Sequence, residues 1–282
     1  MKKLSRILLL LIVGFTLSIH LFASETIYPF EVKISGKGKQ AIILIPGFAS
    51  SGKVWDETKV LFEKNYTCYT LTMAGFAGEA PVKNSTFKSW ENGIAAYIED
   101  ENLGKTIIIG HSMGGGLALA LAADYPELIA KIIVVDALPC LAALSNPTFI
   151  SKEVNDCSEM VNKFATIKES DFYTMQKSSI RQLMEDTIHQ KMVIDWSMKT
   201  DRTTFAEMYC DFINIDLREN IKTITCPSLI LLESYFINSK PAIEQQYKNL
   251  KTGNLHYATQ GLHFIMYDDP NWYNKQITDF IN

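Results

Sequence analysis

The chain has 282 residues, of which 47% are hydrophobic and 21% are charged, and its formal net charge is −4. This composition is typical of a folded globular protein and excludes a disordered or collagen-like chain. No stretch gathers Lys and Arg into a basic stripe, so we do not expect nucleic-acid binding. The length allows one or two domains, and one large α/β domain that carries an insertion fits equally well.

The first segment, residues 1–23, has the pattern of a secretory signal peptide. Three basic residues open it, an apolar run follows over residues 7–22, and Ala23 provides a small residue for cleavage. We therefore expect export to the periplasm or the exterior, without stable membrane association after cleavage. The alternative is an uncleaved membrane anchor, which is less favoured because the apolar run is near the short limit for a membrane-spanning helix.

Short apolar runs along the rest of the chain predict strands. They cover residues 41–45, 66–73, 106–110, 131–136 and 228–233. Several of them lack period-two alternation, as is typical of strands buried on both faces of a parallel sheet. Residues 30–35 alternate more clearly and are expected to form an antiparallel edge strand. Residues 254–258 are a candidate for the last strand.

Helical patterns lie between these strands. They cover residues 54–64, 86–101, 113–125 and 270–281. Strands that alternate with helices predict a doubly wound α/β fold with a mostly parallel sheet. Asp268 and Asp269 precede Pro270 and are expected to cap the N-terminus of the last helix.

A long segment without a convincing strand, residues 137–224, interrupts the alternation. Helical patterns in it cover residues 152–165, 170–186 and 203–213. The segment is far longer than one crossover between parallel strands requires. We therefore predict a core of residues 24–136 and 225–282 and a helical insertion of residues 137–224 over the sheet.

The insertion is rich in large apolar side chains, some of which are expected to line a pocket and the rest to pack against the core. They are Phe149, Met160, Phe164, Phe172, Tyr173, Met175, Trp196, Met208 and Tyr209.

Five Cys residues lie beyond the signal segment: Cys68, Cys140, Cys157, Cys210 and Cys226. An odd number without paired spacing does not indicate a disulfide framework, and no metal-binding spacing such as Cys-x-x-Cys occurs. Cys68 and Cys226 lie in or beside apolar runs and are expected in the core.

The most informative motif is Gly-His-Ser-Met-Gly at residues 110–114. A buried strand precedes it and a helix rich in Ala and Leu follows, which is the context of a nucleophilic serine. Ser112 must stand on a sharp turn, so the positions two before and two after it have to be small, as Gly110 and Gly114 are. The helix N-terminus faces negative charge that forms near Ser112. The alternative is a glycine-rich turn with an incidental serine.

An oxyanion at Ser112 requires two hydrogen-bond donors. One candidate is the backbone N–H of Met113, which directly follows the nucleophile. The other is expected from the loop after the strand at residues 41–45, which begins Pro-Gly-Phe. The backbone N–H of Phe48 is therefore the second candidate, and a plain turn is the alternative.

The general base is found almost by elimination among five His residues. His263 lies in a loop before the final helix and follows Ser112 in the order that a base requires. His20 lies in the signal segment, and His111 is adjacent to the nucleophile, with a side chain expected to point away from it. His189 lies in the insertion, and His256 lies within a predicted strand.

The base also requires a carboxylate at the C-terminal end of a strand between Ser112 and His263. Asp136 ends the run Ile-Ile-Val-Val, and Glu233 ends Leu-Ile-Leu-Leu. A buried carboxylate is costly without a cationic partner, and the imidazolium form of His263 would be that partner. We predict Asp136 as the acid and keep Glu233 as the alternative.

With these residues identified, the chain resembles the α/β-hydrolase superfamily from about residue 30 to the C-terminus. The resemblance rests on Gly-His-Ser-Met-Gly-Gly at residues 110–115, and the insertion matches the superfamily's cap domain. Pro46 replaces the usual His before the oxyanion-loop Gly, and residues 73–78 lack the Asp of the common Asp-x-x-Gly-x-Gly pattern.

A third departure concerns the acid. Relatives commonly carry it just past the strand that follows the cap, where residues 233–238 contain no Asp. Some branches of the superfamily place the acid directly after the strand that follows the elbow. Asp136 stands at that position.

The resemblance implies a serine hydrolase that cleaves a carboxylic ester of a small or medium apolar molecule through an acyl-enzyme at Ser112, with no cofactor or metal. Amide or peptide hydrolysis and carbon–carbon bond hydrolysis use the same triad and are alternatives, as is a non-catalytic ligand-binding protein. Aminopeptidase-like relatives hold the substrate amine with acidic residues. Glu153, Asp156 and Glu159 are candidates for that role, although we expect them at the surface. The oligomeric state does not follow from the sequence.

Overall fold

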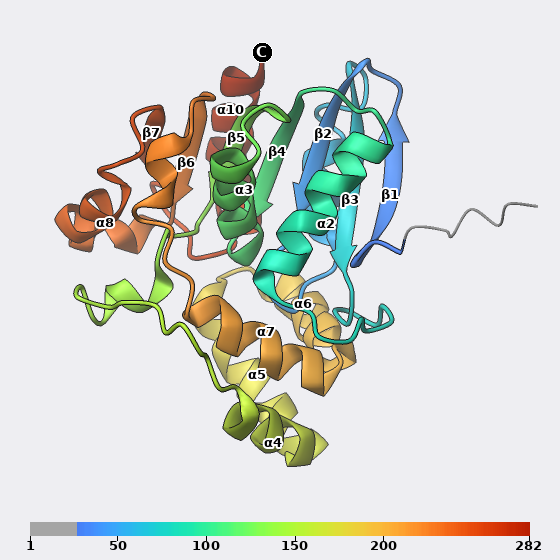
Figure 1. Ribbon diagram of the computed structural model, residues 1–282, viewed down its shortest axis with the longest axis vertical. Helices are drawn as coiled ribbons and strands as arrows, with labels where there is room; N and C mark the ends of the chain where they lie inside the picture. The colour runs from blue at the N-terminus through green and yellow to red at the C-terminus, as the bar shows by residue number, and fades with distance from the viewer. Residues whose placement is uncertain (1–26) are drawn as a thin grey trace, which may run out of the picture.

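A computed structural model describes residues 27–282, so the predicted signal peptide lies outside the described residues. A central sheet has helices on both faces, and a group of helices, α4 to α7, lies at one end of it (Figure 1). This architecture confirms the predicted doubly wound α/β fold class with a helical insertion. Within residues 27–282, no helix is both long enough and apolar enough to cross a membrane.

The sheet has seven strands in the order β1-β3-β2-β4-β5-β6-β7. The strands are β1 (Phe30–Gly36), β2 (Gln40–Ile45), β3 (Tyr66–Met73), β4 (Thr106–His111), β5 (Ile129–Val135), β6 (Ser228–Leu232) and β7 (Gly253–Tyr257). Strand β1 pairs antiparallel with β3 at the edge, and the other neighbours pair in parallel. Each predicted strand is therefore confirmed, including the antiparallel edge strand.

The apolar runs are explained by burial on both faces of the sheet. In β2, Ile43 and Ile45 pack into a cluster with side chains of the helices α2 and α3, whereas Ile42 and Leu44 pack into a second cluster with α10. All four side chains are fully buried. A strand covered on both faces needs no polar alternation.

The core helices are α1 (Asp56–Lys59), α2 (Phe87–Asp100), α3 (Met113–Asp124), α8 (Lys240–Tyr247), α9 (Ile265–Asp268) and α10 (Pro270–Ile281). The helix expected over residues 54–64 is much shorter than predicted. A 3₁₀ turn at Gly52–Trp55 precedes α1, and a tight turn follows it, in which the Phe62 N–H donates to the Lys59 carbonyl.

The insertion contains α4 (Ser158–Thr166), α5 (Glu169–Leu183), α6 (Thr187–Lys199) and α7 (Arg202–Ile213), and no strand is described between residues 137 and 224. Helix α6 was not expected from the sequence. It begins where the Asp186 carboxylate accepts hydrogen bonds from the N–H groups of Ile188 and His189, which caps the helix. The exact division between core and insertion stays a prediction.

The cysteine pattern requires a correction, because Cys157 and Cys210 form a disulfide that joins the start of α4 to α7. The two residues are 53 positions apart in the sequence. They meet only because α4 packs along α7, so their spacing carried no local signal. The other three cysteines are free and buried, which confirms the core positions expected for Cys68 and Cys226.

Candidate active site

Ser112 stands between β4 and α3 with φ 54° and ψ −121°, a backbone conformation that a residue with a side chain rarely adopts. Its N–H donates to the Val135 carbonyl at 2.8 Å, which holds the turn against β5. A Cβ atom at Gly110 would lie 2.1 Å from the Gly114 carbonyl oxygen, and one at Gly114 would lie 2.3 Å from the Ile45 carbonyl oxygen. The sharp turn therefore requires both glycines.

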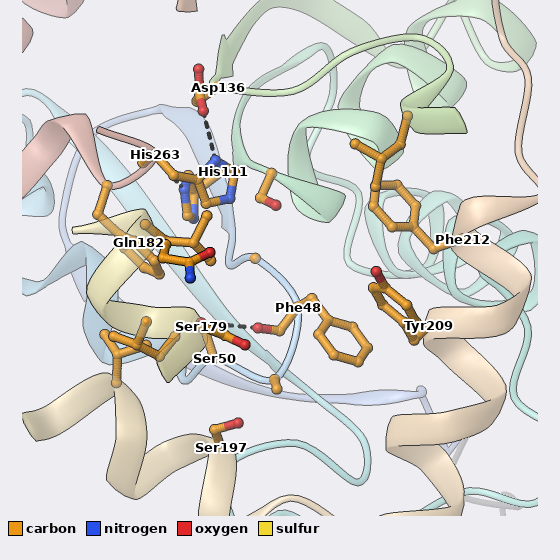
Figure 2. Close-up of a pocket in the computed structure, with 18 of the residues that line it drawn as sticks. Phe48, Ser50, His111, Asp136, Ser179, Gln182, Ser197, Tyr209, Phe212 and His263 are labelled. Carbon is orange, nitrogen blue, oxygen red and sulfur yellow. Dashed lines mark hydrogen bonds and ion pairs between the residues drawn. The ribbon is translucent and has the colours of Figure 1, made fainter. Parts of the chain in front are cut away.

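Asp136 directly follows β5, and its side chain is almost completely buried. Its Oδ2 atom lies 2.6 Å from His263 Nδ1 (Figure 2), and its Oδ1 atom accepts a hydrogen bond from the Glu233 N–H at 2.7 Å. Its own N–H donates to the Leu231 carbonyl at 2.7 Å. The carboxylate is therefore fixed at both oxygens, in an orientation that holds the His263 ring.

Glu233, the alternative acid, follows β6 and lies beside this pair. Within the described residues, its carboxyl group makes no hydrogen bond to His263. Burial and, to a smaller extent, the negative charge of Asp136 raise the pKa of the Glu233 carboxyl to about 7, and His263 acts in the opposite direction. The structure brings Asp136, and not Glu233, into hydrogen-bond contact with His263, while their catalytic roles stay predictions.

The loop after β2 packs against the elbow. The Ser50 N–H donates to the Gly47 carbonyl at 3.3 Å, and Ala49 has φ 53°, so residues 47–50 form a tight turn. A Cβ atom at Gly47 would lie 3.1 Å from the Ser112 Cβ atom. Glycine at this position allows the loop to approach the nucleophile.

Two backbone amides near Ser112 are not used by the fold. Met113 is the first residue of α3, where an N–H group has no partner within the helix. Within the described residues, the Phe48 N–H makes no hydrogen bond either. Phe48 and Ser112 line the same cavity. Both amides are therefore available as donors, although their role at an oxyanion stays a prediction.

His111 has a place in the site that its sequence position did not suggest. It is buried, its ring centre lies 4.6 Å from that of His263, and its Nε2 atom lies 3.0 Å from the His263 carbonyl oxygen, to which it donates. Burial lowers the pKa of His111 well below its usual range, and His263 lowers it further. A neutral His111 thus supports the backbone of His263. A polar residue at the end of a fully buried strand was the available signal.

Asp268 and Asp269 do not cap α10 as expected, since no side-chain hydrogen bond is found at that helix start. The Asp268 carboxylate accepts hydrogen bonds from the N–H groups of Leu262, Glu185 and Asp186 at 2.9–3.0 Å. Asp269 instead accepts from the Thr259 hydroxyl at 3.0 Å. Asp268 thus ties the loop that carries the predicted base to the segment between α5 and α6, about 80 residues away in the sequence.

A cavity of about 590 Å³ lies between the elbow and the insertion, with Ser112, Asp136, Glu233 and His263 among its lining residues. From the apolar residues predicted in the insertion, Phe164, Met175 and Tyr209 line it. None of the three acidic residues considered for an aminopeptidase, Glu153, Asp156 and Glu159, lies on its wall. Among residues 27–282, no group of three or more His, Cys, Asp or Glu side chains is placed to hold a metal ion.

Comparison with known proteins places this geometry in a family. The family model described as alpha/beta hydrolase fold matches residues 40–220, which is more than half of the chain. The chain is 24% identical over 205 residues to the pimeloyl-[acyl-carrier protein] methyl ester esterase of Wigglesworthia glossinidia brevipalpis, a match that covers 71% of this chain and 76% of that protein. It is 23% identical over 193 residues to the esterase of the same name from Aliivibrio fischeri, covering 68% and 73%.

Solved structures share the fold. The enol-lactonase from Burkholderia xenovorans LB400 has a TM-score of 0.74 at 17% identity, covering 89% of this chain and 96% of that one. The esterase EaEST from Exiguobacterium antarcticum has a TM-score of 0.73 at 17% identity, covering 89% and 95%. The chain therefore belongs to the alpha/beta hydrolase fold family and is a hydrolase.

Proposed function

We propose that this protein cleaves carboxylic esters of small or medium, largely apolar molecules through an acyl-enzyme at Ser112. The observation that carries the proposal is the convergence on one cavity of a serine on a strained turn and of the His263–Asp136 pair, joined by a 2.6 Å hydrogen bond. The curated relatives named above are esterases of a methyl ester, which supports an ester as the substrate.

The reaction follows from the atoms that face the cavity. His263 Nε2 takes the proton from Ser112 Oγ, and this oxygen attacks the carbonyl carbon of the ester. The carbonyl oxygen becomes an oxyanion, which the N–H groups of Phe48 and Met113 stabilise. The carbon–oxygen bond of the ester then breaks, and the leaving alcohol takes the proton from His263.

Water completes the cycle by the same route. His263 removes a proton from the water molecule, which attacks the acyl-enzyme and releases the acid and Ser112. Asp136 stays ionised throughout, holds the His263 ring in one tautomer and stabilises the imidazolium that forms. In this series of reaction steps, His263 is the only proton carrier that Ser112 needs.

The first test uses p-nitrophenyl esters of increasing acyl length with the wild-type protein and Ser112→Ala. We expect hydrolysis by the wild type and a loss of at least a thousandfold in the variant. The chain length that gives the highest kcat/KM measures how much of the 590 Å³ cavity an acyl chain fills. Equal rates for the two proteins would exclude the serine mechanism, and activity on amides or diketones alone would exclude ester specificity.

We also propose that the protein is exported and cleaved near residue 23. The Cys157–Cys210 disulfide supports export, because disulfides persist in oxidising compartments and are rare in the cytosol. N-terminal sequencing of the protein from cell fractions tests the proposal. An intact Met1 in a soluble cytoplasmic fraction would exclude it, and an intact Met1 in the membrane fraction would indicate the anchored alternative.

A further inference from the structure

One wall of the cavity is polar and comes from the insertion. Gln176, Ser179 and Gln182 on α5 line it together with Ser197 on α6, and three of these four are labelled in Figure 2. The three residues on α5 recur at a spacing of three positions, which places them on one face of the helix. Ser179 and Gln182 are exposed, whereas Gln176 and Ser197 are buried, so the polar wall leads from solvent into the cavity.

Gln176 offers the cavity a hydrogen-bond donor that the fold does not use. Only 6% of it is exposed, and its Oε1 atom accepts a hydrogen bond from the Ser197 hydroxyl at 2.6 Å. Within the described residues, its Nε2 group makes no hydrogen bond, and this group is not sealed off from the cavity. An amide N–H on the wall of a cavity can donate to an acceptor on a ligand, and a ligand without an acceptor there would displace water without replacing its hydrogen bond.

The opposite wall is apolar and aromatic. Figure 2 shows Phe48, Tyr209 and Phe212 across the cavity from Ser179 and Ser197. The Phe48 ring packs against Phe205 at 4.6 Å and against Tyr209 at 5.4 Å between ring centres. An aliphatic chain can therefore lie on one wall while a polar group along it faces the other.

The charges of the cavity disfavour a charged substrate end. Besides Tyr209, the ionisable lining residues are Asp136, Glu233, His111 and His263, and neither Lys nor Arg lines the described cavity. An anionic group would find no cation and would face carboxylates. The Asp136 carboxylate is already engaged by hydrogen bonds with His263 and with the Glu233 N–H, and the Glu233 carboxyl, whose pKa is raised to about 7, is ionised only in part at neutral pH.

Building on the proposed esterase function, we propose that the cavity binds an uncharged ester whose chain carries a second carbonyl group, and that Gln176 and Ser197 form the subsite for that carbonyl. The Gln176 Nε2 group donates to the carbonyl oxygen. The Ser197 hydroxyl donates to Gln176 Oε1 and thereby fixes the amide with its N–H groups toward the substrate. The chemical class is thus an amide-ester or a diester.

The proposal is tested with methyl esters of six- to nine-carbon acids that end in a methyl group, a primary amide, a carboxylate or an ammonium group. The proteins are the wild type, Gln176→Leu and Ser197→Ala. Gln246→Leu is the matched control, because Gln246 is equally buried and hydrogen-bonded through its Oε1 atom but does not line the cavity. Each protein is characterised by the ratio of kcat/KM for the amide-ended and alkyl-ended esters of one length.

At its preferred chain length, the wild type is expected to favour the amide-ended ester over all three others. Gln176→Leu should lower the amide-to-alkyl ratio about tenfold, because one hydrogen bond in a desolvated site is lost. Ser197→Ala should lower the ratio by a smaller factor, and Gln246→Leu should leave it unchanged. A preference for either charged ester, or the same ratio in Gln176→Leu and the wild type, would overturn the subsite.

A binding measurement separates this inference from the esterase proposal. Calorimetric titration of Ser112→Ala with the same esters reports the subsite without turnover. One outcome is that no ester is hydrolysed, but Ser112→Ala binds the amide-ended ester about tenfold more tightly than the alkyl-ended ester and Ser112→Ala/Gln176→Leu does not. In that case the esterase function fails and the subsite holds. Serine-dependent hydrolysis without any preference for the amide-ended ester would leave the esterase and remove the subsite.

Discussion

The substitution Asp136→Asn tests how the predicted base is held. Oδ1 of Asp136 accepts from the Glu233 N–H, and an Asn side chain retains this bond through its own oxygen. Its NH2 group then faces His263 Nδ1, where the wild type has an acceptor 2.6 Å away. His263 must therefore present a bare Nδ1 and carry its proton on Nε2, and this tautomer cannot accept the proton of Ser112.

The expected loss is about 10⁴-fold in kcat, which corresponds to about 5 kcal/mol in the activation free energy. The fold should survive, because Asn has nearly the same shape and leaves no buried backbone donor without a partner. The change should fall on kcat rather than on KM, since Asp136 acts on the substrate only through His263.

The assay measures kcat and KM on the best p-nitrophenyl ester, with a thermal melt to verify folding. Glu233→Gln is the matched control, and because the Glu233 carboxyl makes no hydrogen bond to His263, it should lose less than about tenfold. If Asp136→Asn kept more than a tenth of the activity while Glu233→Gln lost most of it, the assignment of the acid would be wrong.

Three further predictions concern stability. Asp268→Ala leaves three backbone amides without their acceptor, so we expect a destabilisation of about 3 kcal/mol and a lower kcat. The control is Asp279→Ala on the exposed face of α10, which should change neither the stability nor kcat. The Glu233 pKa is raised from 4.5 to about 7, chiefly by burial, so the folded protein loses stability as the pH rises through that interval. In urea denaturation, the free energy of unfolding of Glu233→Gln should equal that of the wild type at pH 4 and exceed it by about 1 kcal/mol at pH 8. A less stable variant at pH 8 would contradict this prediction. Replacing Cys157 and Cys210 by Ser should cost about 2–4 kcal/mol, and an unchanged melting temperature would show that the disulfide does not form.

Features that depend on neighbouring residues were predictable from the sequence alone. The strand, turn and helix around Ser112 occupy about 20 consecutive residues, and the need for Gly110 and Gly114 follows from the local backbone alone. The strands were predictable because a residue buried on both faces of a sheet must be apolar wherever its neighbours lie in the sequence. Helix α6 was missed because its apolar positions follow no clear helical period.

Contacts between distant segments depend on how the helices and strands pack in three dimensions. Asp136 and His263 are 127 residues apart, and the sequence left both Asp136 and Glu233 as candidates to hold the imidazole. The order of β5, β6 and β7 places both carboxylates near the ring, and only Asp136 makes a hydrogen bond to it. The hydrogen bonds of Asp268 join the core to the insertion. The Cys157–Cys210 disulfide and the Gln176–Ser197 pair join segments that meet only when the helices of the insertion pack together. A polar side chain shows in the sequence that it needs a partner, but only the packing of the elements determines which partner lies within reach.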